Sequence, residues 1–73
     1  MMNDKNTICI KGDKTNIDIF SNKIQKKYDL DIVESESINS KHYHLKTNKT
    51  VKDKEPELRK MATSNGLKIS WVS

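Results

Sequence analysis

The chain has 73 residues, of which 14 are basic and 10 acidic, with a formal net charge of +4 and a single cysteine, Cys9. This length allows one domain with a thin core, and a single cysteine excludes both an internal disulfide and a four-thiolate zinc site. No apolar run approaches a membrane span, and the first residues lack the apolar stretch of a signal peptide. We therefore expect one small, soluble, cytoplasmic domain over residues 1–73.

Basic residues are concentrated in the second half of the chain. Residues 1–36 carry six lysines and seven acids, whereas residues 37–73 carry eight basic and three acidic residues. Such asymmetry can indicate attraction to nucleic acid or to another anionic surface. The chain is also rich in Lys, Asn and Ile and has one arginine, Arg59, which is equally typical of AT-rich coding. Composition therefore leaves open whether the basic charge reflects an anionic ligand or coding bias.

The first predicted element is a strand in residues 6–12. Ile8 and Ile10 alternate with their neighbours, and Gly12 ends the pattern. Cys9 should therefore point to the opposite face from the two isoleucines.

A helix is predicted over residues 13–28, because four apolar residues recur there at helical spacing. These residues are Ile17, Phe20, Ile24 and Tyr28. Asp13 or Thr15 is available as the N-cap, and Asp18 is expected in the first turn.

Residues 29–35 predict a second strand, which has Leu30 and Ile32 on one face and Asp31 and Val33 on the other. The polar stretch in residues 35–40 predicts a turn.

A third strand is predicted in residues 41–47, where strand period fits better than helix period. Tyr43 and Leu45 share one face, and the other face carries His42, His44 and Lys46.

Residues 47–56 predict a polar connection, followed by a second helix with Pro56 in its first turn and Gly66 as its C-terminal cap. The residues of this helix expected to face inward are Leu58, Met61 and Ala62. A fourth strand should alternate Leu67, Ile69 and Trp71 against Lys68, Ser70 and Val72.

The resulting order, βαββαβ, predicts an α+β ferredoxin-like (split βαβ) sandwich, in which two helices cover one face of a four-stranded antiparallel sheet. The first and third strands should be central, and the other face should be open. The residues expected on the open face are Cys9, Lys11, Asp31, Val33, His42, His44, Lys46, Lys68, Ser70 and Val72.

This open face suggests nucleic acid as one ligand, because RNA-recognition modules of similar topology stack bases on sheet aromatics. Here the corresponding positions hold Cys9, His42 and His44, and a single arginine gives little capacity to read base edges. Lysine-driven, salt-sensitive binding of single strands remains an alternative.

Metal binding or catalysis would use the same three residues, with Cys9 as thiolate ligand or nucleophile and the histidines as ligands or base. No fourth ligand is evident, and a cysteine between isoleucines is usually a small packing residue. We therefore expect no metal, no cofactor, no catalytic residue and no enzymatic activity.

The segment "SKHYHLKTNKTVKDKEPELRKMATSNGL" is similar to the central part of HicA-type toxins, small ribonucleases of a double-stranded-RNA-binding-like fold. In that family a Ser and a His precede a strand, and a helix ends in Gly-Leu. The resemblance implies ribonuclease activity with His42 or His44 as the catalytic residue. It covers fewer than half of the residues and lacks the family's glycine before the serine.

The sequence hypothesis that we favour is a non-catalytic binding or regulatory protein, an inhibitor or adaptor from a phage or a low-GC bacterium. It would dock a basic face on an acidic protein partner. The residues of that face are Lys11, Lys41, His42, His44, Lys46 and Lys68. A single-stranded nucleic-acid binder is the alternative, and self-association into a homodimer is a third reading.

Overall fold

The computed structural model describes residues 6–71, which form four strands and two α-helices. The strands are β1 (Thr7–Lys11), β2 (Ile32–Asn39), β3 (His42–Thr47) and β4 (Lys68–Trp71). The helices are α1 (Lys14–Lys27) and α2 (Glu55–Ser64), and a short 3₁₀ turn, η2 (Lys52–Lys54), precedes α2. Val72, which was expected on the open face, lies outside the described residues.

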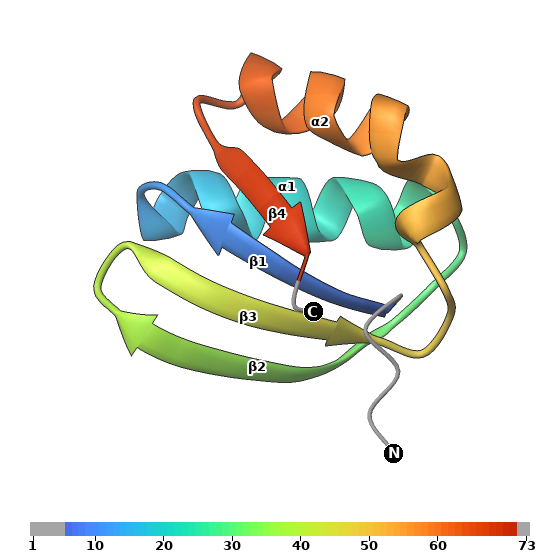
Figure 1. Ribbon diagram of the computed structural model, residues 1–73, viewed down its shortest axis with the longest axis horizontal. Coiled ribbons are helices and arrows are strands. Elements are labelled where there is room, and N and C mark those ends of the chain that lie inside the picture. Colours follow the sequence, from blue (N-terminus) through green and yellow to red (C-terminus); the bar gives the residue numbers. More distant parts are fainter. Residues whose placement is uncertain (1–5, 72–73) are drawn as a thin grey trace.

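The strands form one antiparallel sheet in the order β2-β3-β1-β4, with β1 and β3 at the centre (Figure 1). The predicted ferredoxin-like topology is therefore confirmed. Each central strand pairs on both sides, so its backbone groups are satisfied within the sheet.

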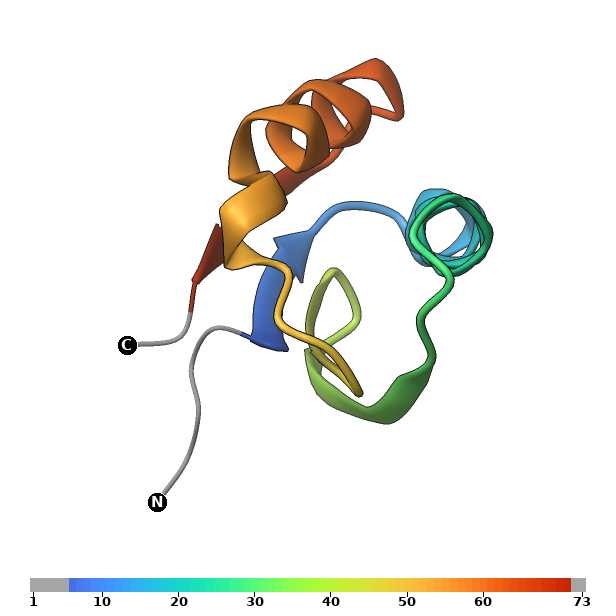
Figure 2. The same ribbon diagram turned by 90° about the vertical axis from the view of Figure 1, so that its right-hand side faces the viewer.

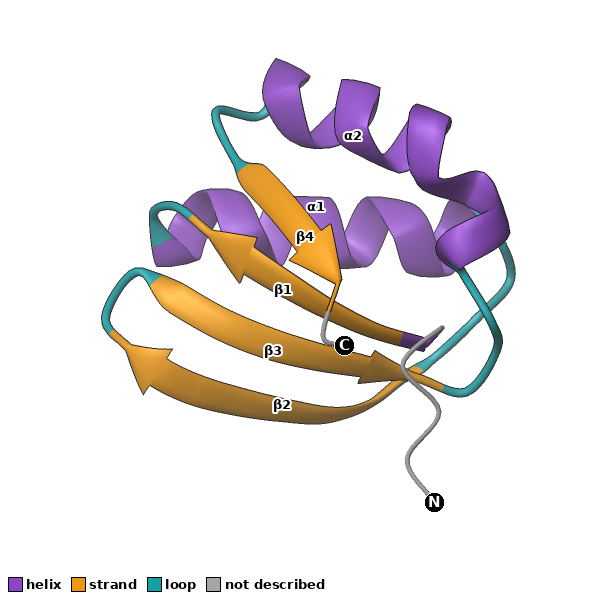
Figure 3. Ribbon diagram, viewed as in Figure 1, coloured by secondary structure: helices purple, strands orange, loops and turns teal. Residues whose placement is uncertain are grey.

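Both helices lie along the same side of the sheet (Figures 2 and 3), and the core fills the space between the two layers. Ile8 and Ile10 of β1 are fully buried, whereas Cys9 between them is only partly buried. The alternation read from the sequence thus places Cys9 on the opposite face. The buried apolar residues are Ile8, Ile10, Ile17, Phe20, Ile24, Leu30, Leu45, Val51, Leu58, Ala62, Leu67 and Ile69.

Helix α1 begins at Lys14, and Asp13 occupies the N-cap position. The Asp13 side chain forms no capping hydrogen bond; its carboxylate lies 3.5 Å from Nζ of Lys41. Asp18 was expected in the first turn, and this is wrong, because the helix starts early enough to leave no acid there. Asp18 instead pairs with Lys14 at 3.2 Å, one turn along the helix.

Strand β2 is the main departure from the sequence prediction. It begins at Ile32 and continues to Asn39, through the stretch predicted as a turn; the actual turn contains only Ser40 and Lys41. Its register against β3 shifts twice, between Ile32 and Glu34 and again between Ser37 and Asn39. Such bulges put one extra residue into one strand, so strict alternation fails there.

The first shift corrects the expected open face. Asp31 lies before β2, where its backbone N–H donates to Oδ1 of Asn48, and Val33 falls within the irregularity. Glu34, opposite Lys46, takes the open-face position instead. Two carboxylates, Glu34 and Glu36, therefore stand where an aspartate and a valine were predicted.

The connection after β3 is not wholly polar, as had been predicted. Val51 is completely buried in the core, just before η2. Thr47 is also fully buried, and its hydroxyl donates to the backbone carbonyl of Lys49 or Asn6. The loop is thus anchored to the body of the protein near its start.

Helix α2 and strand β4 follow the prediction. Pro56 lies in the first turn, Leu58 and Ala62 are buried, and Met61 packs against the core from a partly buried position. Gly66 follows the helix with φ +70°, a conformation in which glycine is favoured. Neither helix within residues 6–71 has the length and apolarity needed to cross a membrane.

Candidate binding site on the open sheet face

The face of the sheet opposite the helices, called the open face below, consists of cross-strand rows of side chains. Directly paired residues place His44 between Glu36 and Cys9, with Ser70 beyond Cys9 on β4. A second row runs Asn39, His42, Lys11, Lys68, and a third runs Glu34, Lys46, Thr7. The parity predicted for β3 is confirmed, because Leu45 is buried and its neighbours belong to these rows. Tyr43 is only partly buried, less than expected.

The two ends of these rows differ in charge. The predicted binding residues Lys11 and Lys68 face each other on β1 and β4, and both are exposed. At the β2 edge, Glu36 and Glu34 stand opposite His44 and Lys46. The open face is therefore basic at one end and acidic along one edge, rather than basic throughout. These acids could not be predicted on this face from the sequence, because the bulge that brings them there has no marker such as glycine.

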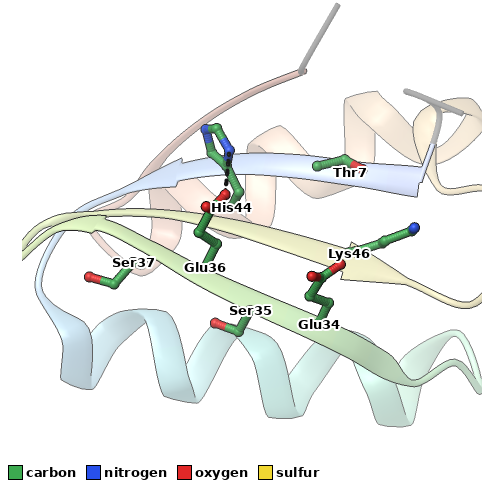
Figure 4. Close-up of a pocket in the computed structure, with 7 residues that line it drawn as sticks. All are labelled: Thr7, Glu34, Ser35, Glu36, Ser37, His44 and Lys46. Carbon is green, nitrogen blue, oxygen red and sulfur yellow. Dashed lines mark ion pairs between the residues drawn. The ribbon is translucent and has the colours of Figure 1, made fainter. Parts of the chain in front are cut away.

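The acidic edge borders a shallow hollow of about 530 Å³. Figure 4 shows Glu36 reaching toward His44, and its Oε1 lies 3.9 Å from Nδ1 of that histidine. Glu34 and Lys46 lie beside each other in the same view. The residues that line the hollow are Thr7, Glu34, Ser35, Glu36, Ser37, His44 and Lys46. Its mixed charge favours no single sign of ligand.

A second hollow, of about 440 Å³, lies at the opposite end of the face. We call it the basic corner, and it is lined by Lys11, Gly12, Asn39, Lys41, His42, Gly66 and Lys68. Its lysines come from three separate segments: β1, the β2–β3 turn and β4. Among the described residues lining it none is acidic, although Asp13 lies 3.5 Å from Lys41 at its rim. This concentration of cations favours an anionic group.

Between the two hollows, Cys9, His42 and His44 come together. Sγ of Cys9 lies 2.8 Å from Nε2 of His42, and the two imidazole rings meet edge to face with centroids 5.3 Å apart. All three side chains are partly buried, and one donor atom from each lies within 4.8 Å of the others. Partial burial, with smaller effects from Lys11 and His44, lowers the pKa of His42 below its usual value. This shift favours the neutral imidazole of His42 over the charged form.

Aromatic rings other than histidine are missing from the described part of this face. Phe20 is buried under the sheet, Tyr28 ends α1, and Tyr43 and Trp71 pack against the core. The only arginine is also engaged elsewhere: Nε of Arg59 donates to Glu55 at 2.6 Å, and its guanidinium donates to the Ile69 carbonyl. The described part of this face therefore has no Phe, Tyr or Trp ring on which a base could stack, and Arg59 is not placed to recognise a base edge with two hydrogen bonds.

Comparison with protein-family models, with curated proteins and with solved structures found no significant match. The sequence resemblance to HicA-type toxins implied a double-stranded-RNA-binding-like fold, and the ferredoxin-like topology differs from it. The function has to be argued from the geometry of the open face itself.

Proposed function

We propose that this protein is a non-catalytic binding module, a small regulator or adaptor that docks the basic corner on an acidic protein partner. The observation that carries the proposal is the placing of Lys11, Lys41 and Lys68, from three segments far apart in sequence, around one hollow. Carboxylates on a partner would meet several ammonium groups there at once. Complementary charge of this kind mainly steers association and fixes orientation.

The docking surface that we propose is smaller than the one predicted from the sequence, because Glu34 and Glu36 also lie on the open face. Lys46 and His44 have Glu34 and Glu36 as direct cross-strand neighbours, which offset their charge. We therefore assign docking to the three lysines of the basic corner together with His42. Lys46 and His44 lie at the margin of the surface.

A protein partner suits this surface better than a nucleic-acid strand. A strand crossing the sheet would bring its phosphates past Glu34 and Glu36, with no Phe, Tyr or Trp on the described open face to stack its bases. Nonspecific single-strand binding depends on both a continuous basic track and aromatic platforms.

The first test compares two triple charge reversals with the wild-type chain. One variant carries Lys11→Glu, Lys41→Glu and Lys68→Glu. The control carries the same charge change on three exposed lysines outside the open face, Lys26→Glu, Lys52→Glu and Lys60→Glu. We expect a partner captured from nuclease-treated lysate to associate at least tenfold more slowly with the first variant and nearly normally with the control.

Two outcomes would contradict the proposal. Equal loss of binding in both variants would mean that only net charge matters, and undiminished binding in both would make the corner ordinary solvated surface. Titration with fluorescent single-stranded RNA and DNA completes the comparison. Micromolar binding near physiological salt, lost in the first variant alone, would establish a nucleic-acid ligand instead.

A further inference from the structure

We propose that Cys9, His42 and His44 form a site for a transition-metal ion of the Zn²⁺ class on the open face, where it shares His42 with the basic corner. From the sequence these three residues were the conceivable ligand set, but no metal was expected, because no fourth ligand was evident. The structure adds the convergence of three donor atoms within 4.8 Å, from two neighbouring strands. This inference stands independently of the proposed partner.

The backbone accounts for this convergence. His42 and His44 are two residues apart on β3, so strand pleating directs both to the same face. Cys9 is the direct partner of His44 on β1. Two central strands, each paired on both sides, thus hold the three ligands on a rigid support, which favours a defined geometry.

The distances are close to those that a bound zinc needs. Bond lengths of about 2.0–2.1 Å to nitrogen and 2.3 Å to sulfur place the ligands of a tetrahedral zinc about 3.3–3.6 Å apart. The Cys9–His42 separation of 2.8 Å is somewhat shorter, and the remaining separations are at most 4.8 Å. These differences are about 1 Å, and small rotations about the side-chain χ angles can close them without a shift of the backbone.

Glu36 supplies a second, independent feature of a metal site. Its Oε1 lies 3.9 Å from Nδ1 of His44, and a small rotation would let the carboxylate accept a hydrogen bond from that nitrogen. Nε2 would then be the ligating atom. A carboxylate behind a ligating histidine orients the ring and increases its basicity.

The donor set selects the metal by its chemistry. One thiolate and two imidazoles suit Zn²⁺ and its substitute Co²⁺, whereas Mg²⁺ and Ca²⁺ require oxygen ligands. Three protein ligands leave one coordination position for water or for a group on a partner. The solvent-facing position of the cluster gives the ion direct access.

The experiment titrates the reduced, chelator-treated protein with Co²⁺ and then displaces it with Zn²⁺. We expect one Co²⁺ per chain, a thiolate-to-cobalt charge-transfer absorption that requires Cys9, and loss of that absorption when zinc is added. Substituting His42→Ala or His44→Ala should weaken zinc binding, measured by calorimetry, by more than tenfold. Substituting Glu36→Gln should weaken it by about tenfold, as for other carboxylates behind ligating histidines.

Ser70→Ala is the matched control, because Ser70 is the other direct partner of Cys9 on the open face and is not a proposed ligand. It should bind zinc as the wild-type chain does. Cys9→Ala and Cys9→Ser are both made, and circular dichroism checks that each is folded. Alkylation of Cys9 in the folded wild-type protein gives the same information without a substitution.

No binding at stoichiometric metal, or zinc affinity unchanged in Cys9→Ser, would overturn the inference. One ion per two chains would also overturn it, because the site would then belong to a dimer. The charge-reversal test of the docking proposal is performed in the presence of chelator, so a bound metal cannot affect its result. Failure of the docking proposal and failure of the metal site can therefore be distinguished.

Discussion

Gly12 lies where β1 leaves the sheet, and the side chain of Leu67 fills the space that a β-carbon on Gly12 would need. A β-carbon built there would overlap Cδ2 of Leu67, and the residue has φ +151°. Leu67 is buried immediately before β4, so it has little freedom to move aside. Glycine is thus required at this position by both backbone conformation and packing.

We therefore expect Gly12→Ala to lower the free energy of unfolding by about 1–3 kcal/mol, the usual cost of overpacking. Urea titration measures this. Gly66 is the comparison: at φ +70° its β-carbon would meet only Nδ2 of Asn16, at 3.7 Å. Gly66→Asn should cost little, because asparagine tolerates this conformation, whereas Gly12→Asn should be as damaging as alanine. Equal costs at the two sites would contradict the packing argument.

At the scale of elements, Tyr28 links the end of α1 to α2. Its hydroxyl donates to Oε1 of Glu57 at 3.1 Å, and Lys27 pairs with the same carboxylate at 3.3 Å. Burial, then the hydrogen bond to Glu57 and its negative charge, raise the pKa of Tyr28 to about 12. The neutral phenol is therefore favoured in the folded state over the phenolate.

Because the folded-state pKa is raised, the stability that Tyr28 contributes is present below pH 10 and is lost as pH rises from 10 toward 12. We expect the difference in unfolding free energy between wild type and Tyr28→Phe to shrink across that interval. Taking this difference cancels the titration of lysines, which both proteins share. In Glu57→Gln, absorbance titration should show the Tyr28 phenol ionising at lower pH; an unchanged titration would contradict the assigned hydrogen bond.

The elements also show what a single sequence can and cannot predict. The strands β1, β3 and β4 each have one face on the core, so apolar residues alternate in them and their positions were predicted correctly. Strand β2 lies at the edge, with mostly exposed side chains, and its two register shifts remove the alternation. A polar, bulged edge strand resembles a turn in sequence, because burial is what produces the pattern.

The same cause explains the outcome for the candidate site. The central-strand residues Cys9, His42 and His44 were placed together correctly from strand parity alone. The neighbouring Glu34 and Glu36 were missed, since their placement depends on a bulge. Val51, a lone apolar residue in a lysine-rich stretch, was missed because one buried residue forms no periodic pattern.

For the whole molecule, a chain of this size has a small margin of stability. Typical values of 0.05–0.15 kcal/mol per residue would give about 4–11 kcal/mol here. Phe20 is fully buried and is the largest side chain with almost no exposure. Its loss should therefore affect the entire fold.

We expect Phe20→Ala to lower the free energy of unfolding by about 3–5 kcal/mol, a large share of the total. Ile19→Ala is the control, because the neighbouring side chain on the same helix is 42% exposed. The control should lose less than about 1 kcal/mol. Comparable losses in urea or thermal unfolding would mean that α1 does not bury the face described above.

The position of β1 has a consequence for how the chain folds during synthesis. This strand is made first among the described elements, yet both its neighbours come later: β3 supplies residues 42–47 and β4 residues 68–71. A nascent chain that ends before β3 leaves β1 with unpaired backbone groups on both edges, and one that ends before β4 still leaves one edge open. Long loops must close before such pairing is gained. The sheet can therefore be completed only after β4 has left the ribosome, so a chain arrested before that strand should retain an exposed edge that is prone to aggregate.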